Sequence, residues 1–341
     1  MTKPAGVDAG PDHDAVPGDD AGPNDDGGPR DDGGLRGELR TRLIGALQRV
    51  PELAGQPLGF TALSGGITNR NFLIQVGGQA DRFVLRLAGN DTHLLGISRE
   101  VEHAATVAAA GVGVGPEVVA FIRPEGYLVT RFIVGGPVSN EAVHRPETIR
   151  RVADSIRRVH DGPPIPGLFI PFRIVEAYGA LARARGVPIP GEYDRAMSVA
   201  RRIERAFVAA PIELRPCHND LLNANFIDDG ERIRIVDWEY AGLGDPFFDL
   251  GNFSVNHGLR PDEDAELLRA YEGAIDPARA ARLHCMRVMS DFREAMWGVL
   301  QQGISSLDVD FVTYASEHFD RLLSNAGTPE FKRALEAAAE G

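Results

Sequence analysis

Apolar residues in the first third of the chain change from helical spacing to the spacing of short strands. Leu39, Leu43 and Leu47 recur every four residues, which predicts a helix over about 36–49 that ends before Pro51. Short apolar runs separated by turns then predict an antiparallel meander followed by a hairpin. The expected strands cover about 58–62, 72–74, 83–87, 118–122 and 127–129. With a helix over 98–110 placed before the hairpin, these residues are expected to form a small sheet.

Beyond residue 134 the apolar spacing becomes helical almost throughout. The expected helices cover about 146–159, 173–185, 191–209, 246–257, 277–302, 307–325 and 329–339. One hairpin interrupts them, formed by Asn225–Ile227 and Arg232–Val236. A small β lobe (35–133) followed by a larger helical lobe (134–341) is an α+β architecture, and the cleft between two such lobes is the expected place for a ligand.

Composition separates the first 34 residues from the rest of the chain. They hold nine Asp against Lys3 and Arg30, a net charge of −7 out of −13 in total. Because this segment has little to bury, we expect 1–34 to be a disordered acidic tail, either simply solvated or an interaction segment. The mildly acidic remainder disfavours nucleic acid as a partner. The sequence has no apolar run of roughly 18 residues and no secretory signal, so we expect a cytoplasmic protein that makes no membrane contact. We expect it to be a monomer or homodimer.

Two residue counts narrow the possible chemistry. Lysine occurs only at Lys3 and Lys332, which excludes a phosphate-binding Walker lysine, a Schiff base and a lysine general base within the body. Any anion bound there must meet arginine, protonated histidine or backbone N–H groups. Cys217 and Cys285 are too few for a disulfide framework or a zinc cluster built on thiolates.

The strongest chemical signal is the pattern His218-x-Asp220 followed by Asn225 and, after the hairpin, Asp237. Phosphoryl transfer from ATP needs a carboxylate that orients the attacking hydroxyl and accepts its proton. It also needs oxygen ligands that hold Mg²⁺ against the phosphates. Asp220 suits the first task, and the hairpin would bring Asn225 and Asp237 together for the second. The alternative is an ordinary hairpin loop rich in Asn and Asp.

A second signal lies between the first two strands. The segment Ser64-Gly65-Gly66-Ile67-Thr68-Asn69 has the glycine pair that lets backbone N–H groups approach phosphates, although Gly-Gly is also a common hairpin turn. Arg86 lies on an otherwise apolar strand and is a candidate phosphate-binding cation, the alternative being an edge-strand arginine that faces water. Its carboxylate partner is expected on the following helix, at Glu100 or Glu102.

Two further polar residues have structural interpretations. Asp249 falls in an apolar helix that Asp245 can cap, and a buried carboxylate there needs partners, so we expect Asp249 to brace the catalytic loop. His218 is expected to be a second structural brace rather than a metal ligand or a base. A nucleophilic Cys217 is the minor alternative beside it, because cysteine is commonly just buried.

Together these residues resemble the choline/ethanolamine kinase group of the aminoglycoside-phosphotransferase-like kinases, a protein-kinase-like superfamily. The resemblance extends from about Leu58 into the helix expected over 307–325. The matching segments are Leu63–Asn69, Thr130–Ile133, Cys217–Phe226, Asp237–Tyr240 and Phe248–Asn252.

The resemblance implies an ATP- and Mg²⁺-dependent transfer of phosphate to the hydroxyl of a small molecule. Ser64, Gly65, Gly66 and Asn69 would belong to the nucleotide loop. Arg86 stands where protein kinases have lysine, and Glu102 stands at the place of its partner. Arg131 and Ile133 would pair with adenine through backbone groups.

The resemblance also indicates an acceptor pocket with two departures. Asn256 stands where members that bind choline have an acidic residue, and Glu294 replaces the first tryptophan of a Trp-x-x-Trp pair whose second member is Trp297. One aromatic wall of a quaternary-ammonium cage is therefore missing, while Tyr240 and Trp297 remain. The expected acceptor is a cationic amino alcohol such as choline or ethanolamine. An aminoglycoside or other antibiotic phosphotransferase and a catalytically silent pseudokinase are the alternatives.

Overall fold

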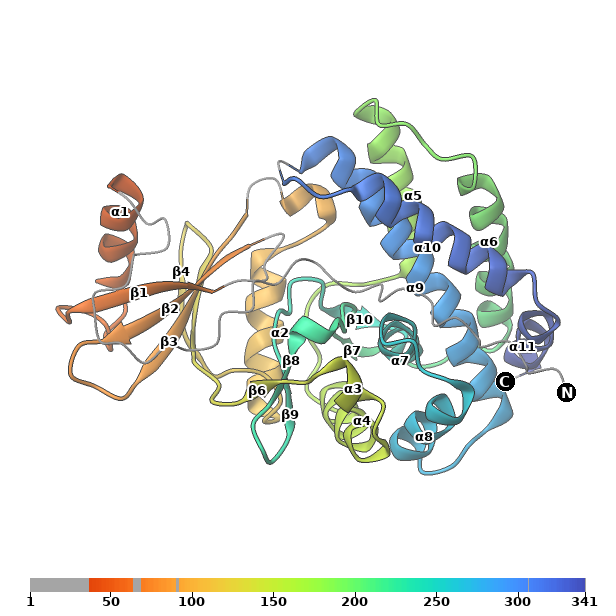
Figure 1. Cartoon of the computed structure of the whole chain (residues 1–341), viewed down its shortest axis with the longest axis horizontal. Coiled ribbons are helices and arrows are strands. Elements are labelled where there is room, and N and C mark those ends of the chain that lie inside the picture. Colours follow the sequence, from red (N-terminus) through yellow and green to blue (C-terminus); the bar gives the residue numbers. More distant parts are fainter. Residues whose placement is uncertain (1–36, 64–68, 90–91, 306, 341) are drawn as a thin grey trace, which may run out of the picture.

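The computed structural model describes residues 37–63, 69–89, 92–305 and 307–340. Its first part is a five-stranded antiparallel sheet with the order β1-β2-β3-β5-β4. The strands are β1 (Leu58–Leu63), β2 (Arg70–Val76), β3 (Arg82–Leu87), β4 (Val118–Ile122) and β5 (Tyr127–Arg131). All five expected strands are present, and helix α1 (Glu38–Leu47) packs into the same apolar core (Figure 1).

Alternation along β3 decides which side chains leave this core. Phe83, Leu85 and Leu87 are buried in it, so the intervening Val84 and Arg86 point to the opposite face. Thr130 and Leu128 of β5 lie directly opposite these two residues in the sheet. The face that carries Arg86 is therefore turned toward the helical part of the molecule.

Helix α2 (Arg99–Gly111) lies between the sheet and the helical part (Figure 1). It follows a short 3-10 turn, η1 (Thr92–Leu95), and the Ser98 side chain accepts a hydrogen bond from the backbone N–H of Val101. Such a cap satisfies a helix donor that has no partner within the helix. The first turn of α2 places Glu102 inside the protein.

The remainder is mostly helical and encloses the long α9. The helices are α3 (Asn140–Val143), α4 (Pro146–His160), α5 (Pro171–Ala184), α6 (Tyr193–Ala209), α7 (Pro246–Asn256), α8 (Pro261–Glu272), α9 (Pro277–Ile304), α10 (Phe311–Ala326) and α11 (Pro329–Glu340). Six of them begin with proline, which suits the first helical position because no N–H is needed there. Helix α9 is buried along most of its length, as expected for a helix that other helices surround.

Short strands within the helical part hold the loops next to the sheet. Strand β8 (Phe226–Asp228) pairs with β9 (Ile233–Ile235), as the expected hairpin requires, and β6 (Gly136–Pro137) extends this pair. Strands β7 (Arg215–Cys217) and β10 (Gly242–Gly244) pair with each other. The turn η2 (Asn223–Asn225) leads into β8. The expected α+β architecture of a small antiparallel sheet and a larger helical part is confirmed.

Several elements were not expected from the sequence, namely α3, α8, β6, β7 and β10. Helix α8 begins with Pro261 and three acidic residues and buries little besides Leu267 and Leu268, so its apolar stripe is too narrow to stand out. Strands β7 and β10 have three residues each and owe their pairing to contacts made far along the chain. Among the described helices, none combines the length and the apolar character needed to cross a membrane.

Candidate active site

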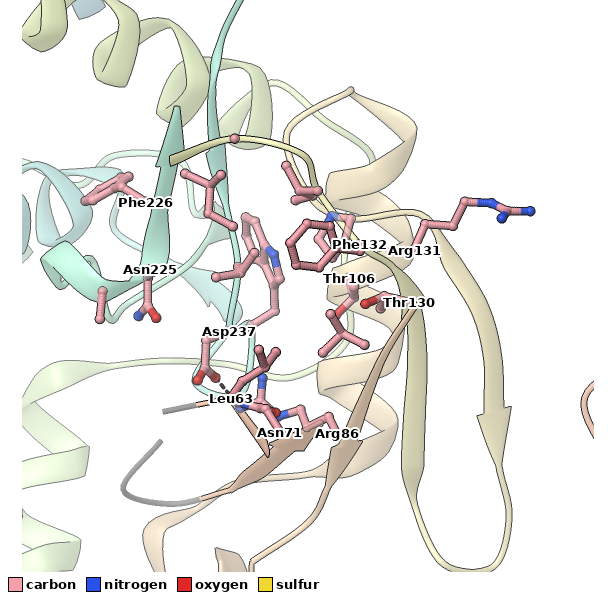
Figure 2. Close-up of a pocket in the computed structure, with 18 of the residues that line it drawn as sticks. Leu63, Asn71, Arg86, Thr106, Thr130, Arg131, Phe132, Asn225, Phe226 and Asp237 are labelled. Carbon is pink, nitrogen blue, oxygen red and sulfur yellow. Dashed lines mark hydrogen bonds and ion pairs between the residues drawn. The ribbon is translucent and has the colours of Figure 1, made fainter. Parts of the chain in front are cut away.

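A cavity of about 470 Å³ lies where the Arg86 face of the sheet meets the β8–β9 hairpin. Figure 2 shows Arg86, Asn225 and Asp237 around it, with the Arg131 side chain pointing away. The backbone from Thr130 to Ile133 forms another part of its lining. Among the predicted nucleotide-loop residues, Ser64, Gly65 and Gly66 lie outside the described residues. Five predicted site residues from distant parts of the sequence thus line one cavity.

Arg86 joins the two parts of the molecule through carboxylates. Its Nε lies 2.9 Å from Oε1 of Glu102, and its Nη2 is ion-paired with Oδ1 of Asp237. Oε2 of Glu239 lies 3.6 Å from the same Nη2. Burial alone would lower the pKa of Arg86, but these carboxylates raise it overall. The guanidinium therefore stays charged at the edge of the cavity.

Asn69, which belongs to the predicted nucleotide loop, and Arg99 extend this network. The Asn69 amide donates to Oε2 of Glu239 at 2.8 Å and accepts a hydrogen bond from Arg99 Nη2 at 3.0 Å. Arg99 Nη1 also donates to Oε2 of Glu102 at 2.6 Å. Burial and the nearby Asp237 raise the pKa of Glu239 to about 7. Asn69, which directly precedes strand β2 of the sheet, is thus hydrogen-bonded to Glu239 of the helical part.

Asp249 holds the loop that carries Asp220. Its carboxylate accepts hydrogen bonds from the backbone N–H of His218 at 2.8 Å and of Asn219 at 2.6 Å. The same carboxylate lies 3.0 Å from Nε2 of His160. Asn219 has a φ of 67°, a left-handed conformation that asparagine tolerates better than most residues. The buried Asp249 side chain therefore holds the loop at Asn219, the residue with the left-handed backbone conformation.

His218 reaches across to the strand that precedes Asp237. Its Nε2 lies 2.9 Å from the carbonyl oxygen of Val236, while its Nδ1 accepts a hydrogen bond from the backbone N–H of Asp220 at 3.2 Å. This pair of partners fixes the neutral tautomer with the proton on Nε2. Burial lowers the pKa of His218, in agreement with a neutral ring. The ring ties the backbone of Asp220 to the backbone next to Asp237.

Asn225 and Asp237 present oxygen atoms to the cavity. The Asn225 amide nitrogen donates to the carbonyl oxygen of Asp220 at 2.8 Å, so its Oδ1 must point elsewhere. Among the described residues, that Oδ1 and the second carboxylate oxygen of Asp237 have no hydrogen-bond partner. One amide oxygen and one carboxylate are the hard donors that Mg²⁺ accepts. The donor set therefore fits a magnesium ion.

Asp220 lies beside an arginine that the sequence analysis did not single out. Arg293 Nη1 donates to Asp220 Oδ1 at 3.1 Å and to Glu294 Oε1 at 2.5 Å. Burial raises the pKa of Asp220 to about 7, even though the Arg293 charge opposes the rise. Glu294, which shares Nη1 of Arg293 with Asp220, adds to the rise in the pKa of Asp220.

Three of the four predicted acceptor residues gather around this pair. Trp297 Nε1 donates to the hydroxyl of Tyr240 at 3.0 Å, and the Tyr240 ring lies under the Arg293 guanidinium, 4.3 Å from its central carbon. Glu294 accepts a second hydrogen bond, from the Tyr314 hydroxyl at 2.9 Å. Asn256 lies at the C-terminal end of α7, where none of the described hydrogen bonds joins it to this group.

The phosphotransferase enzyme family model matches residues 59–283, which include the sheet, the Asp220 loop and the β8–β9 hairpin. The chain belongs to the phosphotransferase enzyme family. A solved choline/ethanolamine kinase family protein from Mesorhizobium loti is 34% identical to this phosphotransferase, with a TM-score of 0.77 over 89% of this chain and 99% of that one. The family resemblance expected from the sequence is confirmed.

The name LicA recurs among the relatives and solved structures. Protein LicA of Haemophilus influenzae is 28% identical over 211 residues, which cover 61% of this phosphotransferase and 61% of the relative, so the match spans less than two thirds of that protein. A solved structure of LicA in complex with AMP is 20% identical, with a TM-score of 0.65 over 82% of this chain and 96% of that one. The second likeness supports the kinase-like fold.

Three charged residues of this phosphotransferase escaped the sequence analysis. Glu239 follows Asp237 at a spacing of two, and Arg99 opens a helix whose acidic residues had already been considered. Arg293 carried the clearest signal, since it stands beside Glu294 and two residues after Asp291 in a buried part of a long helix. Adjacent opposite charges inside a buried helix require partners, and one of those partners is Asp220.

Proposed function

We propose that the protein transfers the γ-phosphate of ATP to the hydroxyl group of a small molecule. The observation that carries this proposal is the grouping of Arg86, Asn225 and Asp237 around one cavity, with the carbonyl of Asp220 bonded to Asn225. This grouping joins a phosphate-binding cation, a magnesium donor set and a hydroxyl-orienting carboxylate. The AMP-bound relative supports a nucleotide as the phosphate donor.

The nucleotide would enter the cavity with its base against the hinge. Among the described residues, the backbone N–H of Ile133 has no hydrogen-bond partner, while that of Phe132 donates to the carbonyl of Arg82 at 3.0 Å. Val84 and Leu128 supply apolar surface on the sheet side of the cavity. The free donor and the apolar walls suit a planar base, with Ile133 N–H and the Arg131 carbonyl as its partners.

The phosphates would lie toward Arg86 and the magnesium donors. Arg86 would release part of its contact with Asp237 and bind phosphate oxygens, with Glu102 keeping the guanidinium in place. Asn225 and Asp237 would hold Mg²⁺, which when bound neutralises phosphate charge. Catalysis would consist mainly of positioning and charge compensation.

Asp220 would orient the acceptor hydroxyl and accept its proton. The acceptor oxygen forms the new bond to the γ-phosphorus, the bond from that phosphorus to the β–γ bridging oxygen breaks, and ADP leaves. The names of the relatives point to amino alcohols of the choline and ethanolamine type as acceptors.

An ADP-release assay with Mg·ATP over a panel of amino alcohols, sugars and aminoglycosides tests this proposal. Acceptor-dependent ADP release that disappears in a folded Asp220→Asn variant is the expected result. Binding of Mg·ATP is measured by the melting temperature, because a ligand that binds only the folded state raises its thermal stability. No rise in melting temperature with Mg·ATP would contradict the proposal.

A further inference from the structure

The guanidinium of Arg293 has one edge that the protein leaves unused. The residue is only 1% exposed, and its Nη1 is shared by Asp220 and Glu294. Its Nε and Nη2 are also buried, yet neither has a hydrogen-bond partner among the described residues. Buried donors without a partner are uncommon in folded proteins and require an explanation, because their desolvation is not compensated.

The two unused donors form a matched pair. Nε–H and Nη2–H lie on the same side of the planar guanidinium and point in nearly parallel directions. This edge fits the two oxygens of a carboxylate or a phosphate, a geometry that lysine cannot reproduce. Because Nη1 of the same group contacts Asp220, an oxyanion bound to the edge would lie close to the hydroxyl that Asp220 orients.

The neighbouring side chains cannot supply that oxyanion. Glu294 already uses both carboxylate oxygens, one for Arg293 and one for the Tyr314 hydroxyl. The Tyr240 hydroxyl accepts from Trp297. Apart from the second carboxylate oxygen of Asp220, for which no partner is found among the described residues, the unused hydrogen-bonding capacity at this point is that of the Arg293 donors, and a ligand oxyanion would be their complement.

The same arginine occupies the aromatic surface that a quaternary ammonium would need. Its central carbon lies 4.3 Å from the centroid of the Tyr240 ring, within the range of a cation–π contact. A ligand such as choline would meet a fixed positive charge at this ring. A cavity of about 70 Å³ is lined by Tyr240 and Tyr178, so it borders the ring against which the guanidinium packs, although Arg293 itself is not among its lining residues.

We propose that the acceptor of this phosphotransferase carries an oxyanion close to its hydroxyl, and that the Nε–Nη2 edge of Arg293 binds it. Arg293 is then a specificity-determining residue, and a short hydroxy acid, a hydroxy amino acid or a phosphorylated alcohol fits the site. An amino alcohol that also bears a carboxylate satisfies both this inference and the names of the relatives. The inference rests on the proposed phosphoryl transfer.

Matched acceptors tested on the full-length protein decide the matter. In the carboxylate arm, ethanolamine is compared with serine and glycerol with glycerate. In the phosphate arm, glycerol is compared with glycerol phosphate. One member of each pair carries an oxyanion and the other does not. Steady-state ADP release gives kcat/KM, and calorimetry gives binding. We expect the oxyanion-bearing member of at least one arm to have a kcat/KM about tenfold or more above that of its partner.

Arg293→Lys keeps the positive charge and removes the paired edge. This variant should bring the ratio of kcat/KM within the preferred pair close to one, whatever happens to the absolute rate through Asp220. Arg287→Lys is the matched control, because Arg287 lies on the same helix and pairs with Asp264 away from this group. The kcat/KM ratio of Arg287→Lys should stay at the wild-type value. A changed ratio in Arg293→Lys alone could then not be attributed to a general loss of helix packing.

Three results would overturn the inference. They are a wild-type preference for ethanolamine or choline over the oxyanion-bearing acceptors, an unchanged ratio in Arg293→Lys, and no calorimetric binding of any oxyanion probe at millimolar concentration. If Arg293→Lys does not fold, the wild-type ratio alone decides. If Mg·ATP still raises the thermal stability while one of these results is found, the proposed phosphoryl transfer stands and only the inference on Arg293 fails. If the protein shows neither nucleotide binding nor turnover, the proposed function itself is refuted.

Discussion

Arg86 on strand β3 is ion-paired with Asp237, which follows strand β9 in the other lobe. The same guanidinium contacts Glu102, so a single cation compensates carboxylates from both sides of the cavity. Because the body of the chain has no lysine, arginine is the permanent cation available for this position. The stability of the protein and the proposed binding of phosphate therefore involve the same side chain.

Arg86→Gln should lower the free energy of unfolding by about 3–5 kcal/mol, because it leaves Asp237 without its cation and leaves the buried Glu102 and Glu239 with Arg99 alone. Urea denaturation followed by circular dichroism measures the change. Arg123→Gln is the control, since the Arg123–Glu100 pair is 61% exposed on both sides and should contribute little. Equal, small effects of the two substitutions would show that the Arg86 pair is not structural.

Asp220→Asn and Asp237→Asn should fail in different ways. Loss of the Asp220 carboxylate should reduce kcat by roughly 10²–10⁴ while Mg·ATP still raises the melting temperature. Loss of the Asp237 carboxylate should weaken the Mg²⁺-dependent rise in melting temperature as well as turnover. Nucleotide titrations with and without Mg²⁺ separate the two effects, and matching behaviour of the two variants would refute the assigned roles.

The arrangement of the loop that carries Asp220 could be predicted from sequence because its signal is local. His218, Asp220 and Asn225 fall within eight consecutive residues, and the hairpin that brings Asn225 near Asp237 closes over twelve. The backbone bond from Val236 N–H to the Asn225 carbonyl, 3.0 Å long, is a direct consequence of that hairpin. Short-range patterns of this kind carry both the chemistry and the geometry.

Arg293 and Arg99 could not be placed from sequence in the same way. Arg293 lies 73 residues beyond Asp220, and Arg99 lies 140 residues before Glu239. Such pairs form only when α9 and α2 pack against the loop region, and no local periodicity encodes that packing. The surroundings of the candidate acceptor residues, which depend on these long-range contacts, could accordingly be predicted from sequence less completely than the Asp220 loop and its hairpin.

Asp249 should contribute a stability that acid removes. Burial alone would raise the pKa of Asp249, but the hydrogen bond from His160 and the nearby charges lower it overall. Its contribution is therefore complete above the unfolded value of about 3.9 and is lost as the pH falls through the lower folded value. Asp249→Asn should reduce stability at neutral pH and flatten the decline below about pH 4.

Urea denaturation at a series of pH values measures this effect. The control is Asp310→Asn, because Asp310 caps α10 at the surface and its substitution leaves the buried clamp intact. Parallel stability curves for wild type and Asp249→Asn in acid would show that the lowered pKa of Asp249 does not contribute.

Gly251, the one glycine of helix α7, should be sensitive to substitution. A Cβ atom at this position would lie 2.7 Å from the carbonyl carbon of Met286 and 2.8 Å from the backbone nitrogen of Arg287. Backbone atoms of α9 cannot move aside as the end of a flexible side chain can, so α7 and α9 would have to separate. Gly251→Ala should therefore cost about 1–3 kcal/mol of stability through overpacking.

The same displacement should reach the active site through α7. This helix carries Asp249, and it carries Asn252, whose Oδ1 accepts the backbone N–H of Leu221 at 2.5 Å. A shift of α7 should move the loop around Asp220, so kcat should fall in a protein that remains folded. Gly45→Ala is the matched control, because its Cβ meets no atom within 4 Å and the change should stabilise α1 by about 0.4–1 kcal/mol. Denaturation and ADP-release kinetics on both variants test the coupling, and a Gly251→Ala protein with wild-type stability and kcat would show that the contact between α7 and α9 does not position the loop.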